Sequence, residues 1–299
     1  MIEKKDIAVV IPSDMNNDIT LSIITVNFNN KHGLEETIKS IESQTFNDYE
    51  HIIIDAGSDD GSIEVIKSYA ARSNHLTFWV SEADNGIYDG MNKGIMHARG
   101  RYLNFMNSGD RLNNKDILSE IDFDGTGYIY GDVIIKKGNE IEISASPQVV
   151  DFMFIASNTI CHQACFISRE LFEGHLYDTN YKIIADWIHI AECAMWRNTT
   201  FKHIPLIIAE CDAPGISANY RLSWQERCNW ADNNISPFYK QAFTICSQLA
   251  DSPVMDILML PDQSKSFKRK VTRAAKTIYK LSKTFKSLKS KIAPRKGSK

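Results

Sequence analysis

The chain has 299 residues, of which 43% are hydrophobic and 24% are charged, which is an ordinary globular composition with enough length for one large domain or for one domain plus appendages. Its six cysteines form no CxxC pair and no dense framework, which excludes a disulfide-stapled secreted scaffold and indicates reduced cytosolic thiols. The longest apolar runs fall far short of 18 residues, and Ile7–Ile11 is too short for a signal sequence, so neither a membrane span nor a secretory leader is expected.

The net charge of −3 conceals a strong asymmetry along the chain. Residues 264–299 contain 14 Lys and Arg and no Asp or Glu, whereas residues 1–263 contain 20 basic and 37 acidic residues. An acidic body is a poor surface for a polyanion, so no nucleic-acid partner is expected for it.

The first half of the chain predicts a parallel sheet built from βαβ units. From residue 21 onward, short β-rich runs alternate with amphipathic helical patterns. The predicted strands are Leu21–Val26, His51–Asp55, Leu76–Val80 and Tyr102–Met106. Apolar residues at helical spacing predict helices between them, around residues 34–41, 63–70 and 91–98.

The pattern becomes less regular after Asp110, which predicts an α+β second half with longer loops. Strands are predicted at Tyr128–Ile135, Gln163–Ile167 and Phe201–Cys211, and helices at Lys182–Trp196 and over residues 219–250.

Polar residues follow each of the first four predicted strands. The strand ends read TVN (25–27), DAGSDDGS (55–62), EADNG (82–86) and NSGD (107–110). Taken singly, each is also an ordinary turn or helix cap. Ligands of open parallel sheets bind beyond the carboxyl ends of the strands, and carboxylates without His or Cys partners suit Mg²⁺ or Mn²⁺ bridging a diphosphate. The sequence has no GxGxxG after the first strand and no GxxxxGK[ST], so it lacks the usual dinucleotide and P-loop motifs.

At these residues the sequence resembles the family 2 glycosyltransferases, which are inverting, nucleotide-sugar-dependent enzymes of GT-A fold. The resemblance runs from about Leu21 to about Arg227. It rests on LSIITVNFNN (21–30), YEHIIIDAGSDDGSIEVI (49–66) and EADNGIYDGMNKGIMHARGRYLNFMNSGDRL (82–112). The second half continues with YGDV (130–133), HQACFISRELF (162–172), YKIIADWIHIAE (181–192) and PGIS (214–217), in the order seen in the bacterial polysaccharide-assembly branch.

The resemblance implies a fold and a set of roles. The fold is an α/β GT-A domain with a Rossmann-like, mostly parallel sheet flanked by helices. Donor-side residues are Thr25, Asn27, Asp55, Asp84, Tyr88, Asn92, Lys93 and Asn107, and acceptor-side residues are His162, Gln163 and Trp187. Asp110 is implied to bind Mn²⁺ or Mg²⁺, and Asp186 is implied to be the catalytic base.

The metal motif departs from the family's usual Asp-x-Asp, often read as DADD. This chain has Asn107-Ser108-Gly109-Asp110, which leaves one carboxylate of three. A single carboxylate together with phosphate oxygens and waters is nevertheless a normal Mg²⁺ arrangement.

Asp186 has two interpretations from its neighbours alone. A carboxylate near the start of a helix is favoured by the helix dipole without any catalytic role. The flanking Ile183, Ile184, Ala185, Trp187 and Ile188 instead predict a site that excludes water and raises the basicity of the carboxylate.

His162 lies between Cys161 and Cys165, which suggests a metal site. Three residues within five positions lack a fourth ligand at usable spacing, and the apolar neighbours favour a buried strand. The family resemblance implies that His162 and Gln163 line the acceptor pocket or pack beneath it.

The basic tail predicts an amphipathic helix. Apolar residues recur at alternating spacings of 4 and 3, at Phe267, Val271, Ala274, Ile278, Leu281, Phe285, Leu288 and Ile292, with Lys and Arg on the other faces. This pattern favours an anionic membrane surface. Docking onto the acidic body, or binding nucleic acid or another partner, stays open as an alternative.

Together these features predict a peripheral bacterial enzyme on the cytoplasmic face of the membrane. It would transfer a sugar from a nucleotide-sugar, UDP-linked rather than GDP-linked, to a lipid-linked oligosaccharide during O-antigen, capsule or exopolysaccharide biosynthesis. The expected organisation is an extension (1–20), a nucleotide-sugar-binding half (21–112), an acceptor-binding half (113–250), a linker (251–263) and the basic helix (264–299). A catalytically silent GT-A scaffold is the main alternative, and a sugar nucleotidyltransferase is a weaker one, because TVNFNN lacks the Gly-rich basic loop that such an enzyme needs.

Overall fold

The structure is a computed structural model that describes residues 19–138, 140–212 and 220–249, together with Arg269, Arg273 and Thr277. The chain divides into two compact units, Met1–Ser247 and Gln248–Lys299. Nearly all of the predicted extension, the linker, the PGIS motif and all but three residues of the predicted basic helix lie outside the described residues. Those parts, and the predicted domain boundaries, stay predictions.

The first half of the chain forms the parallel βαβ arrangement that its periodicity predicts. In chain order the elements are β1 (Leu21–Asn27), α1 (Lys31–Glu42), β2 (Tyr49–Asp55), α2 (Ser62–Ala70), β3 (Leu76–Ser81), α3 (Ile87–His97) and β4 (Tyr102–Phe105). These strands lie in the order β3-β2-β1-β4 and all pair in parallel. The register sets Asn27 directly beside Asp55, so the polar ends of β1 and β2 meet at one edge.

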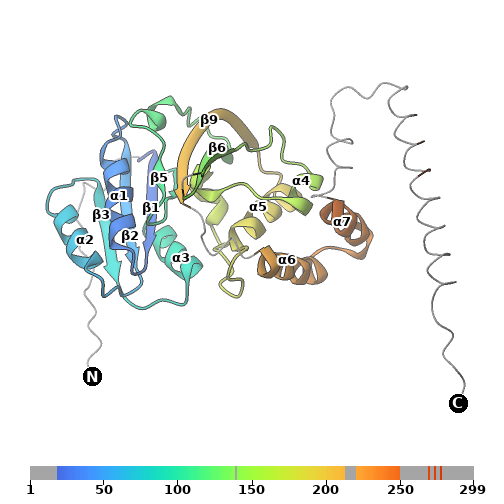
Figure 1. Cartoon of the computed structure of the whole chain (residues 1–299), viewed down its shortest axis with the longest axis horizontal. Helices are drawn as coiled ribbons and strands as arrows, with labels where there is room; N and C mark the ends of the chain where they lie inside the picture. The colour runs from blue at the N-terminus through green and yellow to red at the C-terminus, as the bar shows by residue number, and fades with distance from the viewer. Residues whose placement is uncertain are drawn as a thin grey trace, which may run out of the picture. The chain divides into compact units, whose positions relative to one another are not determined.

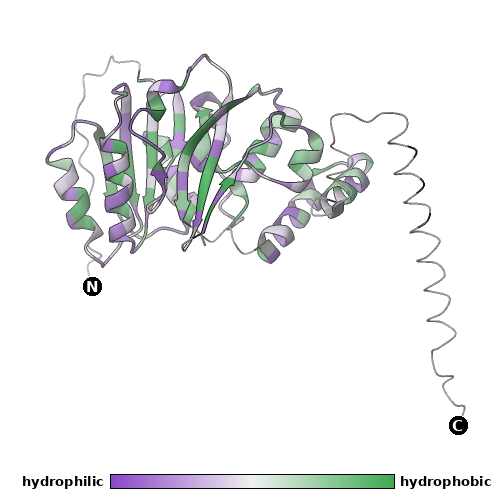
Figure 2. Cartoon of the chain, turned by 45° about the horizontal axis from the view of Figure 1, so that its top comes forward, coloured by the Kyte–Doolittle hydropathy of each residue, from purple (hydrophilic) through white to green (hydrophobic). Residues whose placement is uncertain are grey.

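Alternation along the strands distributes apolar side chains to both faces of this sheet. Ile52 and Ile54 pack with α3, whereas Ile53 packs with α1 and α2 on the opposite face. Figure 1 shows α1 and α3 flanking these strands, and Figure 2 shows that these helices carry both hydrophilic and hydrophobic residues.

Two glycines allow α3 to lie unusually close to β1. A Cβ added at Gly94 would lie 2.4 Å from Cγ2 of Ile24, and one added at Gly90 would lie 2.8 Å from Cγ1 of Val26. These distances are far below van der Waals contact, so only glycine fits at both positions. The close approach brings the start of α3, including Tyr88, beside the carboxyl end of β1.

The second half continues the same sheet in a mixed arrangement. Its strands are β5 (Arg111–Leu112), β6 (Tyr128–Lys137), β7 (Glu140–Ser144), β8 (Cys165–Ser168) and β9 (Phe201–Asp212). The described residues form a nine-stranded sheet in the order β3-β2-β1-β4-β8-β6-β9-β5, with β7 on β6. Strand β8 is antiparallel to both β4 and β6, so the parallel order ends where the second half begins.

One predicted strand boundary is wrong in a way that matters for the site. Residues His162–Ala164 form a 3₁₀ turn, and the strand predicted from Gln163 begins at Cys165. The side-chain amide of Asn104 on β4 donates to the carbonyls of both Gln163 and Cys165, at 3.0 Å each, which anchors this turn to the sheet.

Four helices complete the described fold, namely α4 (Phe152–Ser157), α5 (Ala185–Trp196), α6 (Tyr220–Asn234) and α7 (Pro237–Leu249). The sequence patterns missed α4, β5 and β7. The single helix predicted over 219–250 is two helices, because Pro237 has no amide proton and suits the first turn of a new helix. Helix α5 begins three residues later than predicted.

An aromatic core joins α5, α6 and α7. The ring centroid of Trp187 on α5 lies 5.0 Å from that of Trp230 on α6 and 6.2 Å from that of Phe243 on α7.

Candidate active site

Asp55 closes the edge of the sheet at the ends of β1 and β2. Its carboxylate accepts hydrogen bonds from Nδ2 of Asn27 at 2.7 Å and from Oγ of Ser81 at 2.5 Å. Ser58, in the loop after β2, donates to it from both its backbone N–H and its hydroxyl. Asp55 is fully buried, and its hydrogen bonds to Ser58 fix the position of the loop after β2.

Asp84 and Lys93 stand at the end of β3 and on α3. Asp84 accepts a hydrogen bond from the backbone N–H of Gly86 at 2.9 Å, and burial raises the pKa of its carboxyl. Nζ of Lys93 lies 3.0 Å from Glu82 and 3.8 Å from Asp89. The ammonium is therefore already held by two carboxylates at the rim of the sheet.

Asp110 follows β4 in a turn that Thr37 of α1 stabilises. The Thr37 hydroxyl donates to the backbone carbonyl of Asp110 at 2.7 Å and accepts from the N–H of Gly109 at 3.0 Å. The Asp110 side chain is buried and accepts a hydrogen bond from Nε2 of Gln163 at 2.8 Å. Burial raises the pKa of Asp110, and the bond from Gln163 opposes that rise.

Asp186 lies in the first turn of α5 and accepts three hydrogen bonds. The donors are the hydroxyl of Tyr88 at 2.8 Å, the backbone N–H of Trp187 at 2.9 Å and Nδ1 of His162 at 3.2 Å. Burial by itself raises the pKa of Asp186, but the hydrogen bond and the electrostatic attraction of His162, followed by the hydrogen bonds of Tyr88 and Trp187, outweigh it and hold the pKa below its ordinary value. The predicted rise in basicity is therefore wrong, because the partners of this carboxylate, which include the backbone N–H of the flanking Trp187, outweigh the effect of burial.

The adjacent residues His162 and Gln163 connect the two aspartates. Nε2 of His162 lies 3.0 Å from Nδ2 of Asn107, while its Nδ1 faces Asp186. Gln163 contacts Asp110. The 3₁₀ turn thus brings together residues that the sequence assigned separately to the donor, acceptor, metal and base roles.

The side chains of three predicted site residues make their hydrogen bonds with other parts of the fold. Thr25 is fully buried and its hydroxyl lies 2.9 Å from Nε2 of His51. The amide of Asn92 is used at both ends by the backbone of Tyr177, at 2.8 and 2.9 Å. Trp187 is 1% exposed and donates from Nε1 to the carbonyl of Ile155. Direct ligand contact by these three side chains does not fit their burial and bonding, so they support the fold around the site.

Phe28 is a residue at the site that the sequence patterns missed. It directly follows Asn27 at the end of β1, and its side chain is 64% exposed. The next residue, Asn29, has a φ of +47° and bonds with both Ser58 and Asp59, which fixes the turn that presents Phe28. The sequence did contain a signal for this residue, since a large aromatic side chain stands out in an otherwise polar loop after a strand.

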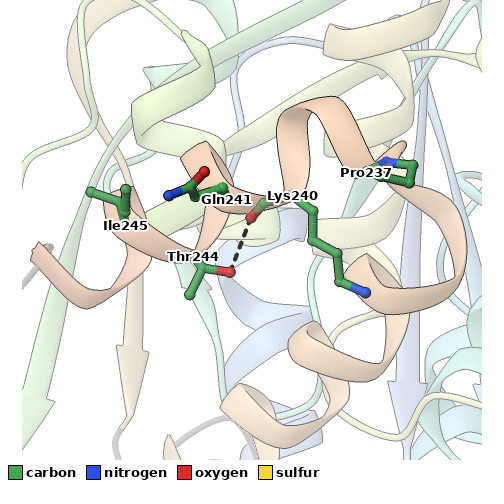
Figure 3. Close-up of a pocket in the computed structure, with 5 residues that line it drawn as sticks. All are labelled: Pro237, Lys240, Gln241, Thr244 and Ile245. Atoms are coloured by element: carbon green, nitrogen blue, oxygen red, sulfur yellow. Dashed lines mark hydrogen bonds between the residues drawn. The ribbon is translucent and has the colours of Figure 1, made fainter.

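Two surface hollows lie apart from these polar residues. One, of about 390 Å³, is lined by Pro237, Lys240, Gln241, Thr244 and Ile245, all from α7 (Figure 3). The other, of about 250 Å³, lies against α5 and is lined by residues that include Tyr181, Glu192 and Asn234. Neither contains Asp110 or Asp186.

The residues fit a hard divalent cation that is held chiefly by its ligand. Within the described ranges, no three His, Cys, Asp or Glu side chains gather in a way that would hold an ion by themselves. Asp110 offers one buried carboxylate, whose oxygens are suitable ligand atoms for a hard cation. Mg²⁺ is commonly bound through one or two carboxylates plus substrate phosphates.

The family model for glycosyl transferase family 2 matches residues 22–180, more than half of the chain. The chain belongs to glycosyl transferase family 2. The family 2 resemblance predicted from the motifs is thereby confirmed, and the chain is a glycosyltransferase. Its curated relatives include the PGL/p-HBAD biosynthesis glycosyltransferase of Mycobacterium tuberculosis, 29% identical over 205 residues that cover 66% of this chain and 78% of the relative. A shorter match, 27% over 103 residues, covers 34% of this chain and 41% of the putative teichuronic acid biosynthesis glycosyltransferase TuaG of Bacillus subtilis.

Solved structures confirm the GT-A fold of this family 2 chain. S. aureus TarS 1–349 in complex with UDP-GlcNAc has a TM-score of 0.60 at 14% identity, covering 77% of this chain and 72% of that one. The mannosyltransferase PcManGT from Pyrobaculum calidifontis, in complex with GDP-Man and Mn²⁺, has a TM-score of 0.54 at 16% identity, covering 92% and 85%. In the described part of the chain, none of the helices is both long and apolar enough to cross a membrane.

Proposed function

We propose that this glycosyltransferase transfers one sugar, with inversion, from a nucleoside-diphosphate sugar to a hydroxyl of a lipid-linked oligosaccharide. The observation that carries the proposal is the environment of Asp186. Its carboxylate is kept ionised by hydrogen bonds and is joined through His162 and Gln163 to the buried Asp110. A base and a diphosphate-side carboxylate are the two groups that this reaction requires.

Asp186 would take the proton of the acceptor hydroxyl as that oxygen attacks the anomeric carbon. Inversion needs the nucleophile and the leaving group on opposite faces of the sugar, as in inverting glycosidases. Its oxygen acceptor sites are not all used by Tyr88, Trp187 and His162, because an ionised carboxylate has about four lone-pair sites. One site is thus left for the acceptor hydroxyl.

On the donor side, Asp110 would hold Mn²⁺ or Mg²⁺. When bound, such a cation neutralises the charge that develops on the departing diphosphate. Asp55 and Asn27 would shape the floor of the nucleotide site, and the exposed ring of Phe28 would stack on the base. We expect UDP rather than GDP as the nucleotide; the two solved neighbours carry UDP-GlcNAc and GDP-Man respectively.

The basic tail leads us to place this reaction at the cytoplasmic face of the membrane, during assembly of a surface polysaccharide such as O-antigen, capsule or exopolysaccharide. A cation near an anionic membrane contributes about 1 kcal/mol, and residues 264–299 contain 14. Vesicles with anionic lipid should pellet the full chain and not a chain ending at residue 263. Equal pelleting of the two would remove the tail from the proposal.

The central experiment compares Asp186→Asn with the native chain. Thermal shifts with UDP, GDP and their sugar conjugates, in Mn²⁺ or EDTA, first identify the donor, because a ligand of the folded state raises the melting temperature. Release of nucleoside diphosphate from that donor should then fall about 10²–10⁴-fold in the variant, with an unchanged donor shift.

Asp132→Asn is the matched control. This aspartate also accepts a hydrogen bond from a histidine, His203 at 3.1 Å, but belongs to the β6–β9 pair. It should keep native turnover. Near-native turnover in Asp186→Asn would remove Asp186 from the mechanism, and a native chain that binds donor without turnover would favour the silent scaffold.

A further inference from the structure

We propose that Asn107 and His162 are positioning residues for the base: Asn107 holds His162 as the neutral tautomer protonated on Nδ1, and that N–H orients Asp186. The proposal deepens the proposed function, since it assigns Asp186 as the base. It concerns two residues that the sequence placed on the donor and acceptor sides.

The imidazole of His162 lies between two side chains of opposite hydrogen-bonding character. Its Nδ1 is 3.2 Å from Oδ2 of Asp186, and its Nε2 is 3.0 Å from Nδ2 of Asn107. An ionised carboxylate only accepts and an amide nitrogen only donates. With the Asn107 amide oriented so that Nδ2 faces the ring, which leaves its buried Oδ1 without a partner among the described residues, the proton sits on Nδ1 and Nε2 keeps its lone pair.

Few other groups near Asp186 change charge around neutral pH. Burial raises the pKa values of Tyr88, Tyr177, Cys161 and Cys165, so all four are neutral at pH 7. Asp110 lies on the other side, behind Gln163. The protonation state of His162 consequently decides whether a positive charge stands next to the base.

A neutral donor orients the base without neutralising it. An imidazolium would pair with Asp186 as an ion pair in a largely buried site, where the side chains of His162 and Asp186 are 17% and 16% exposed, and would weaken its pull on an acceptor proton. The neutral N–H still restricts the rotation of the carboxylate, in the way that a carboxylate orients the histidine of a Ser-His-Asp triad.

The bond between Asn107 and His162 also bears on the metal motif, in which this chain has Asn107 where the family's usual motif has an aspartate. A carboxylate at position 107 would only accept, so it would require a proton on Nε2 and place an imidazolium between two carboxylates. Asparagine supplies the donor that a neutral His162 needs. In this chain Asn107 therefore has a role of its own: its amide donates to Nε2 of a neutral His162, which an aspartate could not do.

The first test reads the tautomer directly in the full chain without ligand. Long-range ¹H–¹⁵N spectra of protein labelled at histidine distinguish the Nδ1–H, the Nε2–H and the doubly protonated rings, and His162→Gln assigns the signal by its loss. At pH 7.5 the native chain should show the Nδ1–H form, and Asn107→Asp should show the doubly protonated ring. A native Nε2–H form, or a native ring doubly protonated at this pH, would overturn the proposal.

The second test uses the geometry of the substitutions. His162→Asn keeps a donor nitrogen near the position of Nδ1, whereas His162→Gln extends past it and loses that donor. Turnover in His162→Gln should fall about 10–100-fold with an unchanged KM for the donor, as is usual when an orienting residue is lost. His162→Asn should recover most of that loss.

His203→Asn is the matched control, since the shorter amide does not reach the position of Nε2 and so removes the partly buried His203–Asp132 bond, in which the two side chains are 14% and 20% exposed. It should leave turnover and the His162 spectrum unchanged. Equal losses in His162→Asn and His162→Gln would mean that the ring acts only by filling space, which would overturn the positioning role.

Asn107→Asp also separates this role from a metal role. If Asn107 served only the cation, the substitution would tighten Mn²⁺-dependent nucleotide binding, raise turnover and leave the His162 spectrum as in the native chain, which would contradict the proposal. We expect lower turnover, because an imidazolium at His162 would pair with Asp186 as an ion pair. Full activity of Asp186→Asn would defeat the proposed function, whereas the tautomer result would stand by itself.

Discussion

Gln163 donates a hydrogen bond from Nε2 to Oδ2 of Asp110 across 2.8 Å. The bond joins the 3₁₀ turn before β8 to the loop after β4, and it is made by the residue next to the histidine that contacts Asp186. A change on one side of this turn therefore reaches both aspartates. Four expectations follow from the described site and core.

Replacing Gln163 with Leu should weaken metal-dependent nucleotide binding about 10–100-fold, as is usual when the partner of a metal-binding carboxylate is removed. The bond opposes the rise that burial causes in the pKa of Asp110, so its loss leaves the carboxylate both less ionised and less well oriented. Titration of Mn²⁺ in the presence of UDP, followed by melting temperature, measures this. Gln241→Leu, an exposed glutamine of α7, should behave as the native chain.

The raised pKa of Asp110 predicts two pH effects of opposite sign. Cation-dependent nucleotide binding needs the ionised carboxylate, so it should be lost at a higher pH than an exposed aspartate would give. The free protein should instead lose stability as the pH rises from the unfolded pKa, about 3.9, through the higher folded pKa, because the folded state binds the proton more tightly. Thermal melts between pH 4 and 7, with and without UDP and Mn²⁺, test both. The same slopes in Asp110→Asn would assign the effects to other groups.

Phe28→Ala should weaken nucleotide binding by about 1–3 kcal/mol, the range found for a base stacked on an aromatic ring. The ring is 64% exposed beside the buried Asn27–Asp55 pair, so its removal should cost little stability. Isothermal titration with UDP measures the change. The control Phe238→Ala removes a still more exposed ring, 83% in solvent on α7. If the two variants bound UDP equally well, Phe28 would have no part in the site.

Trp187→Ala should destabilise the fold by about 3–5 kcal/mol, as expected for a buried aromatic residue in a packed core. The ring contacts Trp230 and Phe243, and its Nε1 bonds the carbonyl of Ile155. Urea unfolding monitored by circular dichroism measures the loss. Trp196→Ala should lose much less, because 52% of that side chain is already in solvent. A stable Trp187→Ala variant with impaired acceptor use would restore the acceptor role predicted from the sequence.

The sequence by itself determined the features that depend on neighbouring residues. Short β-rich runs that alternate with apolar residues at helical spacing predicted the β1–β4 and α1–α3 elements, since strands buried on both faces read as continuous apolar runs and helices buried on one face as a 3.6-residue pattern. The polar loops after the strands predicted the edge where Asn27 meets Asp55, because parallel strands present their carboxyl ends together. The ordered motifs predicted the family.

Only the tertiary structure decided which of these side chains meet. His162 reaches Asp186 across 24 residues and Asn107 across 55, because β8 pairs antiparallel to β4 and its preceding turn lies against the sheet edge. The same packing buries Trp187 and lowers the pKa of Asp186, although its sequence neighbours predicted a rise. A side chain's protonation state and exposure depend on partners far along the chain, and local patterns contain no record of those partners.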